Sequence, residues 1–584
     1  MKDFISRTIA FVLLAGSPAP TAGQIVKIEQ PASQEAKQSS TPPAEERTPH
    51  RVGVDESSPL TLTLFDAVKL ALQNNREIEV ERINVQQANY DLFSARGTRD
   101  ITIGGSSFYE HRVTPSGSVL SGGPNGTVTT RSANWDLNAQ QLLPTGAQWT
   151  AQFTNLRSDT NSIFNSLNPQ YSSVLNFQIR QPVMRGFSLD EARRRIRVAN
   201  RRLDLSDSQF RQKAIEIVSR VQRSYWDLLF GLREVQIQRE AVGLARAQRE
   251  RNSRMVDQGT LAPIELVSVD VELEKRRENV LFALEVVTRA ENALKQLILG
   301  DRSSDVWNKA IIPADVPDLN PVSLKLDEAT AAAFANRQEL AQNNVQQEIN
   351  KIDTRYFSNQ TKPAVDLIAS YTSTGLAGTL VSSTGSPFTA TTDLLVKQVN
   401  TLSELAGLPP LVIAPSAGLP GFLVGGYGQS LANSFGNDFR TFRVGVSLSF
   451  PLRNRAAEGQ LGRSLAEGRK IGAQRKILEQ AIEAEVRNAL QSVEMGRERV
   501  ETARASREAA EKQYQSEQRR FDSGLSTTYF VLERQNTLSE SRGRELRAMT
   551  EYNKAMSELQ RVMGTTLTSA NVEVSTSADK KSGN

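Results

Sequence analysis

The 584-residue chain contains no cysteine and only two histidines, His50 and His111. The absence of cysteine excludes thiolate chemistry, and two histidines leave almost nothing for zinc ligation or for imidazole general-base catalysis. No group of side chains with a catalytic arrangement can be identified elsewhere in the sequence. We therefore expect neither a cofactor, nor a bound metal, nor an enzymatic activity.

The chain also lacks an excess of one charge. Lysine and arginine number 70 against 65 aspartates and glutamates, which gives a net charge of +5. A nucleic-acid-binding surface would need basic residues concentrated on one face. The mixed charges predict a solvated surface and no nucleic-acid partner.

Long hydrophobic runs are missing as well. The apolar stretch Ile9–Ala15 follows Lys2 and Arg7 and precedes small residues, which predicts a secretory signal peptide over 1–23. No later segment approaches the roughly 18 to 20 apolar residues of a transmembrane helix. We therefore expect an exported protein, in which any membrane span is a β-barrel.

The chain between its polar ends repeats itself once. Residues 24–58 are predicted to be a disordered lead-in and 565–584 a disordered tail, because both are polar and poor in large apolar residues. Between them, 59–321 and 322–564 are predicted repeats. One shift of 262 aligns Ala67 with Ala329, Asn74 with Asn336 and Glu77 with Glu339.

Each repeat contains one very long helix followed by a glycine-centred turn and a return helix. The long helices are predicted over 187–258 and 455–523, and apolar residues recur at seven-residue intervals in the first, at Ile196, Leu203, Phe210 and Ile217. At 1.5 Å per residue, each reaches roughly 100 Å. Such helices are coiled-coil-like and largely solvated; an ordinary dimeric coiled coil remains an alternative on this stretch alone.

Period-two alternation predicts strands in both repeats. In 148–154, Trp149, Ala151 and Phe153 alternate with polar residues. This pattern is typical of a strand with lipid on one face and water on the other, although a soluble sandwich would look alike locally. The candidate strands are 99–110, 133–143, 147–157, 172–181, 363–373 and 440–451.

At this point the sequence resembles the TolC family of outer-membrane efflux proteins, over nearly the whole of 60–564. The resemblance rests on the duplicated openings at Leu60 and Ser323, on two proline-ending strands and on two Asp-x-Gly turns. It implies a trimer with a helical tunnel across the periplasm and one shared barrel in outer-membrane lipid. It also implies a periplasmic adaptor (membrane fusion protein) and an inner-membrane pump as partners. The expected fold is thus mostly α, with a trimeric α-barrel and a membrane β-barrel.

The predicted function is a passive outer-membrane exit duct for efflux or secretion. A single copy has too few strands to close a barrel, so association is expected on physical grounds too. The alternative is a periplasmic coiled-coil scaffold without a pore. The first repeat has four candidate strands where the family usually has two, so the hairpin around Pro144 either widens the barrel or packs elsewhere, and we favour the wider barrel.

The resemblance also implies two kinds of functional residue. Residues around the two turns would contact the adaptor: Gly259, Thr260, Leu261, Gly524, Leu525 and Ser526. Glycine at these positions is equally what a plain helix cap requires. A periplasmic gate is expected at Glu533 and Phe530, which occupy the positions of two acidic residues in the family, although Glu533 could be an ordinary solvated helix residue. Glu265 and Asp270 are the next candidates.

Overall fold

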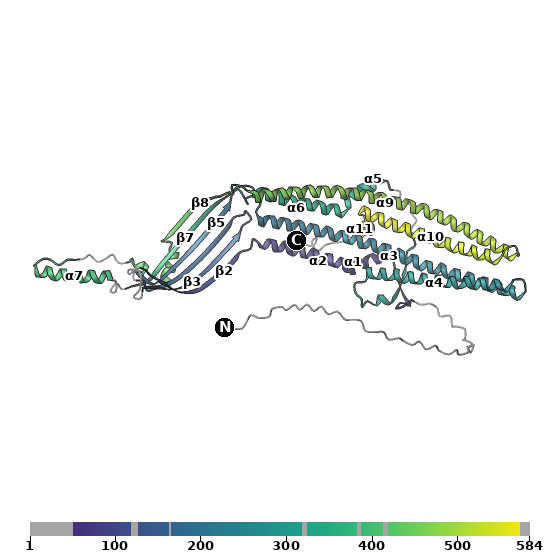
Figure 1. The fold of residues 1–584 in the computed structure, drawn as a ribbon, viewed down its shortest axis with the longest axis horizontal. Helices are drawn as coiled ribbons and strands as arrows, with labels where there is room; N and C mark the ends of the chain where they lie inside the picture. Colours follow the sequence, from purple (N-terminus) through teal and green to yellow (C-terminus); the bar gives the residue numbers. More distant parts are fainter. Residues whose placement is uncertain are drawn as a thin grey trace, which may run out of the picture. The chain divides into compact units, whose positions relative to one another are not determined.

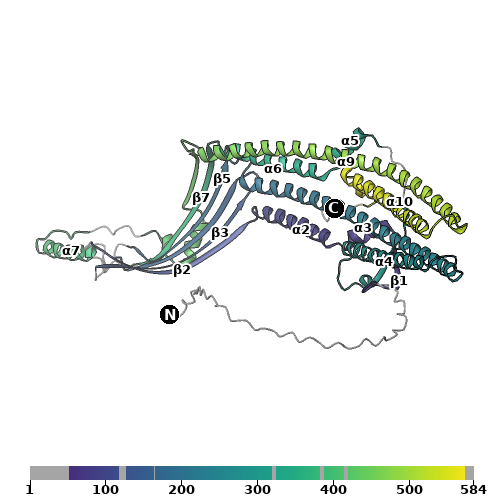
Figure 2. The ribbon, with the colours of Figure 1, turned by 45° about the vertical axis from the view of Figure 1, so that its right-hand side comes forward.

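The computed structural model describes residues 51–117, 126–162, 165–317, 324–381, 387–412 and 419–572. The predicted signal peptide lies outside the described residues, as does most of the predicted lead-in. Within 51–572 a six-stranded sheet lies at one end and the long helices extend from it, as both views show, while a separate two-stranded sheet lies beside the helices (Figures 1 and 2).

The elements follow the predicted order in both repeats. The first repeat contains β1 (Asp55–Leu62), α1 (Leu64–Asn74), α2 (Arg76–Gly97), β2 (Thr102–Pro115), β3 (Thr127–Leu142), β4 (Gln148–Thr160), β5 (Leu167–Pro182), α3 (Glu191–Asp257), α4 (Pro263–Ile298), η1 (Asp305–Asn308) and β6 (Lys309–Pro313). The second contains α5 (Leu326–Asn336), α6 (Gln338–Gln360), β7 (Ala364–Leu380), α7 (Pro387–Leu405), η3 (Gly421–Leu423), α8 (Tyr427–Phe435), β8 (Arg440–Ser449), α9 (Arg455–Asp522), α10 (Thr528–Met563) and α11 (Thr566–Ser569).

All six predicted strands are present, and they form one antiparallel sheet in the order β2-β3-β4-β5-β7-β8. The hairpin around Pro144 is part of this sheet, because β3 pairs with β2 and β4 pairs with β5. Its turn closes with a 2.8 Å bond from the Leu143 amide to the Ala147 carbonyl, and Gly146 supplies the positive φ. The β5–β7 pairing joins the two repeats.

Regular secondary structure extends slightly beyond the predicted repeat boundaries at both ends. β1 starts at Asp55, inside the predicted lead-in, and pairs in parallel with β6, with Leu60 opposite Ile311. Only the end of β1 reaches the core, at Leu62, so the strand has no period-two signal. α11 lies within the predicted tail, with Thr566 fully buried.

Each helical hairpin has its own core, built on the heptad pattern. Phe210 and Ile217 of α3 are buried as the seven-residue spacing predicts, together with Tyr225 and Leu228. A separate cluster joins α9 and α10, where Ile482 and Val486 pack near Leu559. The 67 residues of α3 correspond to about 100 Å of helix.

The duplication is visible in matched joints. A Cβ added to Gly300, just after α4, would lie 2.7 Å from the Asn74 carbonyl oxygen. A Cβ added to Gly564, just after α10, would lie 3.0 Å from the carbonyl oxygen of Asn336. The sequence repeat aligns Asn74 with Asn336. Each repeat therefore contains the same close approach between a glycine after its return helix and the backbone of this asparagine.

Candidate functional site: the tips of the helical hairpins

The two hairpins end in the same turn. In the first, the Gly259 amide bonds the Val256 carbonyl at 2.9 Å and the Thr260 amide bonds the Met255 carbonyl at 2.9 Å. In the second, the Gly524 amide bonds the Phe521 carbonyl at 3.0 Å and the Leu525 amide bonds the Arg520 carbonyl at 2.8 Å. This pair of bonds defines a Schellman cap, which needs a left-handed residue at its centre. Gly259 and Gly524 fill that position with φ of 73° and 75°.

Large apolar side chains lie beside both tips and are exposed. Leu525 is 71% exposed and Ile264 is 68% exposed. Val267 and Val271 continue the exposed stripe along α4. Thr260 is exposed as well, whereas Leu261 and Ser526 are half-buried and Ser526 donates to Glu517. Since several large apolar groups lie beside two turns with free space around their glycines, the tips have the composition of a contact surface.

The predicted gate residues lie on the exposed side of α10. Phe530 is 46% exposed, Glu533 is exposed, and the Phe530 ring meets Tyr529 edge-on at 5.6 Å between centroids. The opposite side of the same turns is buried through Val531 and Leu532. The structure therefore places both residues in the first two turns of α10, where they face away from the chain's own core.

The two reserve candidates differ from Glu533. Asp270 accepts a hydrogen bond from Arg249, and this bond raises the pKa of the Arg249 guanidinium. Glu265 lies half-buried in the first turn of α4. Because the Asp270 carboxylate is already paired with Arg249, it should attract mobile cations less strongly than the Glu533 carboxylate.

Sequence reasoning missed a row of polar links between the two hairpins. The Arg251 guanidinium contacts Asp522 at 3.0 Å, and the buried Asn252 amide donates to the Thr528 hydroxyl at 3.1 Å. Gln248 donates to Asn252 at 2.8 Å and fixes its orientation. These contacts tie the end of α3 to both arms of the second hairpin.

The strongest link is Arg276 of α4, which is only 2% exposed. It donates to the Ala241 carbonyl at 2.9 Å, to Gln535 at 3.1 Å and to Asn536 at 2.8 Å. A signal for it exists in the sequence. Arg276 lies in a seam with alternating spacings of four and three residues, whose other members are apolar and buried, at Val269, Leu273, Val280, Ala283 and Val287. A charged residue at such a position predicts an internal polar partner.

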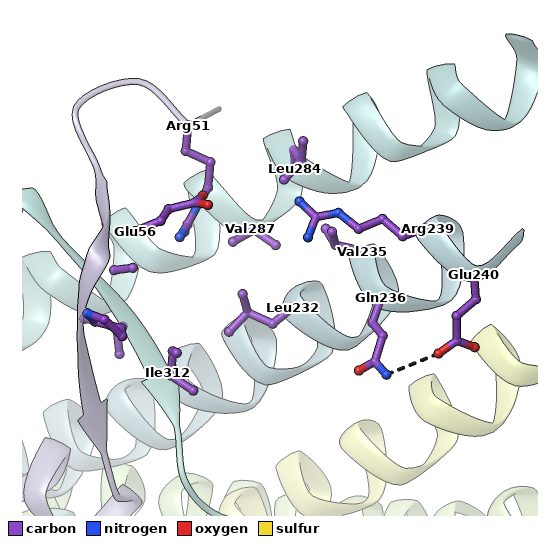
Figure 3. Close-up of a pocket in the computed structure, with 13 residues that line it drawn as sticks. Arg51, Glu56, Leu232, Val235, Gln236, Arg239, Glu240, Leu284, Val287 and Ile312 are labelled. Atoms are coloured by element: carbon purple, nitrogen blue, oxygen red, sulfur yellow. Dashed lines mark hydrogen bonds and ion pairs between the residues drawn. The ribbon is translucent and has the colours of Figure 1, made fainter. Parts of the chain in front are cut away.

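A separate hollow of about 610 Å³ lies between β1, β6 and the α3–α4 pair (Figure 3). Leu232, Val235 and Val287 make one side apolar, while Gln236 bonds Glu240 at 3.2 Å on another. Beside it, Arg51 and Lys295 pair with the buried Glu291. Leu232 is 27 residues before Gly259, so this hollow is about 40 Å along the helix from the tips.

The described ranges contain no group of three or more His, Asp or Glu side chains placed to hold a metal ion. Among the helices in those ranges, none has both the length and the hydropathy to cross a membrane.

Comparison with known proteins places these features in a family. The model of a family described as "Outer membrane efflux protein" matches residues 125–300 and 414–565, one segment in each repeat and together more than half of the chain. No curated protein sequence matches this chain.

Solved structures share its fold at low sequence identity. The outer-membrane channel OprN is 14% identical with a TM-score of 0.57, covering 88% of this chain and 94% of its own. The Campylobacter jejuni CmeC outer membrane channel is 14% identical with a TM-score of 0.58, covering 89% and 88%. CusC, whose structures describe transmembrane channel formation, is 12% identical with a TM-score of 0.58, covering 86% and 92%.

Proposed function

Because the chain belongs to the outer membrane efflux protein family, we propose that it is a passive duct through which an efflux or secretion machine empties across the outer membrane. The family resemblance, fold class and outer-membrane location predicted from the sequence are confirmed. The family is one of transport proteins and not of enzymes. Its members' names do not identify the cargo of this chain.

The observation that carries the proposal is the six-stranded sheet, which has one apolar and one polar face. Cross-strand partners share a face, because side chains alternate along each strand. The apolar face carries Trp135, Leu137, Phe153, Leu175, Phe177, Val444 and Val446. The polar face carries Asn134, Asp136, Gln152, Thr154, Asn176, Gln178, Arg443 and Ser447. This division suits lipid on one side and a water-filled lumen on the other.

The edges of the sheet argue for association. Within the described chain, β2 pairs only with β3 and β8 only with β7. An unpaired edge in lipid costs several kcal/mol for each unsatisfied backbone group. Closure by three copies, each contributing six strands, removes both edges and makes the barrel wider than one built from four strands per copy.

The helical end completes the proposal. The hairpin tips, with their exposed apolar residues, would contact a periplasmic adaptor, and the adaptor would connect the duct to an inner-membrane pump that supplies energy. Glu533 and Phe530 would form successive rings at the narrow end of the tunnel. A scaffold without a pore needs no sheet with one lipid-compatible face, which disfavours that alternative.

The test compares charges placed on the two faces of β8. The parent protein should fractionate with the outer membrane, run as a trimer in mild detergent and conduct ions in planar bilayers. Val446→Arg should impair insertion, because arginine on a lipid face costs about 2–4 kcal/mol near the midplane. Its neighbour Ser447→Arg, on the polar face, is the matched control and should insert normally. Recovery of the parent as a soluble periplasmic monomer, or equal insertion of both variants, would refute the duct.

A further inference from the structure

The helix α8 lies on the apolar face of the sheet, yet it is attached to that face by hydrogen bonds. Ser430 is fully buried and donates hydrogen bonds to the Ser173 hydroxyl at 3.0 Å and the Gly375 carbonyl at 3.1 Å. Asn433 donates to the Leu376 carbonyl at 2.9 Å. The Tyr427 hydroxyl donates to Asn155 at 2.8 Å. α8 is therefore held by hydrogen bonds to β4, β5 and β7.

The residues of the sheet beneath α8 form a compact polar patch, which we call the seat of the helix. Asn155, Ser173 and Gly375 are direct cross-strand neighbours on β4, β5 and β7, and Ser373 adjoins them on β7. A Cβ on Gly375 would lie 1.9 Å from the Ser430 carbonyl oxygen, so only glycine allows this approach. Without α8, these polar side chains would face the same direction as Phe153 and Leu175. In lipid, their hydrogen-bonding groups would then lack partners.

On β4 and β5, the part of this apolar face that α8 leaves uncovered is too short for a membrane. On β4 it runs from Trp149 to Phe153, and on β5 the paired residues run from Ile179 to Leu175. Four steps of about 3.3 Å give about 13 Å. The apolar band of an outer-membrane barrel is about 25 Å tall. α8 lies next along the face, and beyond it the face becomes charged at Arg157 and Asp159.

Aromatic rings from the sheet, from α8 and from the segments that flank it gather around this helix. Phe435 is 67% exposed and its ring lies 5.9 Å from that of Phe153. The rings of Phe422 and Phe439 lie 5.6 Å apart in a tilted arrangement, and the two residues are 47% and 42% exposed. Trp135 lies 6.1 Å from Tyr427. A girdle of aromatic residues is typical of the boundary between the apolar band and water.

We propose that α8 covers the polar seat on the sheet and completes the apolar band at the end far from the helices, and that the exposed rings of Phe435 in α8 and of Phe422 and Phe439 in the segments flanking it bind the acyl chains of outer-membrane lipid. This inference rests on the proposed function, because it requires the apolar face of the sheet to lie in lipid. It assigns a role to a helix that has no helical counterpart among the described residues between β2 and β5 of the first repeat.

The absence of native cysteine allows a direct test by nitroxide labelling of single-cysteine variants of the trimer in liposomes. Collisions with oxygen report lipid, and collisions with a water-soluble nickel chelate report water. A label at Phe435→Cys should show an oxygen-to-nickel ratio several-fold above that at Ser447→Cys on the polar face. It should approach the ratio at Val444→Cys, which lies on the apolar face of β8. Gly375→Val, which removes the space for α8, should lower the ratio at position 435 several-fold and leave that at 444 unchanged.

Each other outcome overturns the proposal in a distinguishable way. A nickel-accessible label at 435 beside a lipid-exposed label at 444 would refute the role of α8 and leave the duct standing. A label at 435 shielded from both reagents would show that protein covers α8. A nickel-accessible label at 444 would refute the lipid-facing sheet itself, and with it both proposals.

Discussion

The two repeats agree closely in their helices and differ in their β regions. Their long helices have 67 and 68 residues, their return helices both have 36, and both turns are Schellman caps. Among the described residues, the first repeat has four strands between α2 and α3, whereas the second has two strands, α7, η3 and α8 between α6 and α9. In both repeats the same caps and the same glycine joints end the helices, and these contacts fix the helix lengths. The β regions need only present an apolar face of sufficient height and continuous backbone pairing, which two different designs can provide.

The repeats also differ at the base of the hairpins. The first has a fully buried ion cluster, in which Glu291 is 1% exposed and pairs with Lys295 and Arg51. In the second, Arg337 pairs with Glu485 at 2.8 Å, but the Glu485 side chain is 43% exposed. The consequences of removing one charge should therefore differ between the repeats.

The largest effect is expected at the buried cluster. Glu291→Gln leaves the buried Lys295 without its carboxylate partner and leaves Arg51 paired only with Glu56, and breaking a buried pair typically costs about 3–5 kcal/mol. The corresponding loss for Glu485→Gln should be about 1 kcal/mol or less, because water screens that pair. Thermal unfolding of the trimer, followed by helical circular dichroism, checks this. Equal shifts in Tm for the two variants would remove the distinction between the repeats.

The next effect concerns the tips. Valine at Gly259 or at Gly524 must adopt a left-handed conformation, at a cost of about 1–2 kcal/mol for each turn. Export should fall while trimers and insertion survive, and the double variant should be the most impaired. Gly243→Val is the control, because Gly243 is an exposed glycine inside α3, away from the turn, with free space around it. Normal export by the double variant would make the turns ordinary caps.

A smaller effect is expected at the gate. If three copies of Glu533 surround the tunnel, their carboxylates concentrate cations there. Glu533→Gln should then lower cation selectivity and weaken block by multivalent cations in planar-bilayer recordings. Glu540→Gln, two turns further along α10 and about 10 Å away, should change selectivity less. A larger change from Glu540→Gln would move the constriction away from the tip.

The smallest effect is a pH dependence at one of the aligned glutamates. Hydrogen bonds from Arg220 at 2.7 Å and from Lys213 hold the pKa of Glu77 below its ordinary value of 4.5. A lowered folded-state pKa stabilises the fold fully above the unfolded-state pKa, and the stabilisation is lost as the pH falls through the folded-state value. Because the pair is partly exposed, we expect about 0.2–1 kcal/mol. The Tm difference between the parent and Glu77→Gln should be constant near neutral pH and disappear as the pH falls below 4.5. A difference that grows on acidification would contradict the pairing.

Local patterns predicted most of this fold, and long-range contacts account for what they missed. The heptads placed Phe210 and Ile217 in a core, alternation located all six strands of the sheet, and the Asp-x-Gly turns marked both caps. The sequence did not predict β1, because this strand is exposed along most of its length and is defined by its distant partner β6. The link from Arg276 to Gln535 and the seat of α8 also join residues that only the folded chain brings together. The roles of the tip and gate residues remain predictions.

The central claim is that separate copies close the sheet, and disulfide cross-linking of its two edges tests it most directly. Within one chain, β2 and β8 are five strand spacings apart, or about 24 Å, far beyond the roughly 7 Å between Cα atoms that a disulfide can span. Cysteine at Ser107 in β2, combined in turn with cysteines from Phe442 to Leu448 in β8, should give at one register a covalent ladder that ends at three chains. A scan with no cross-link at any register, or one that stops at two chains, would contradict the account.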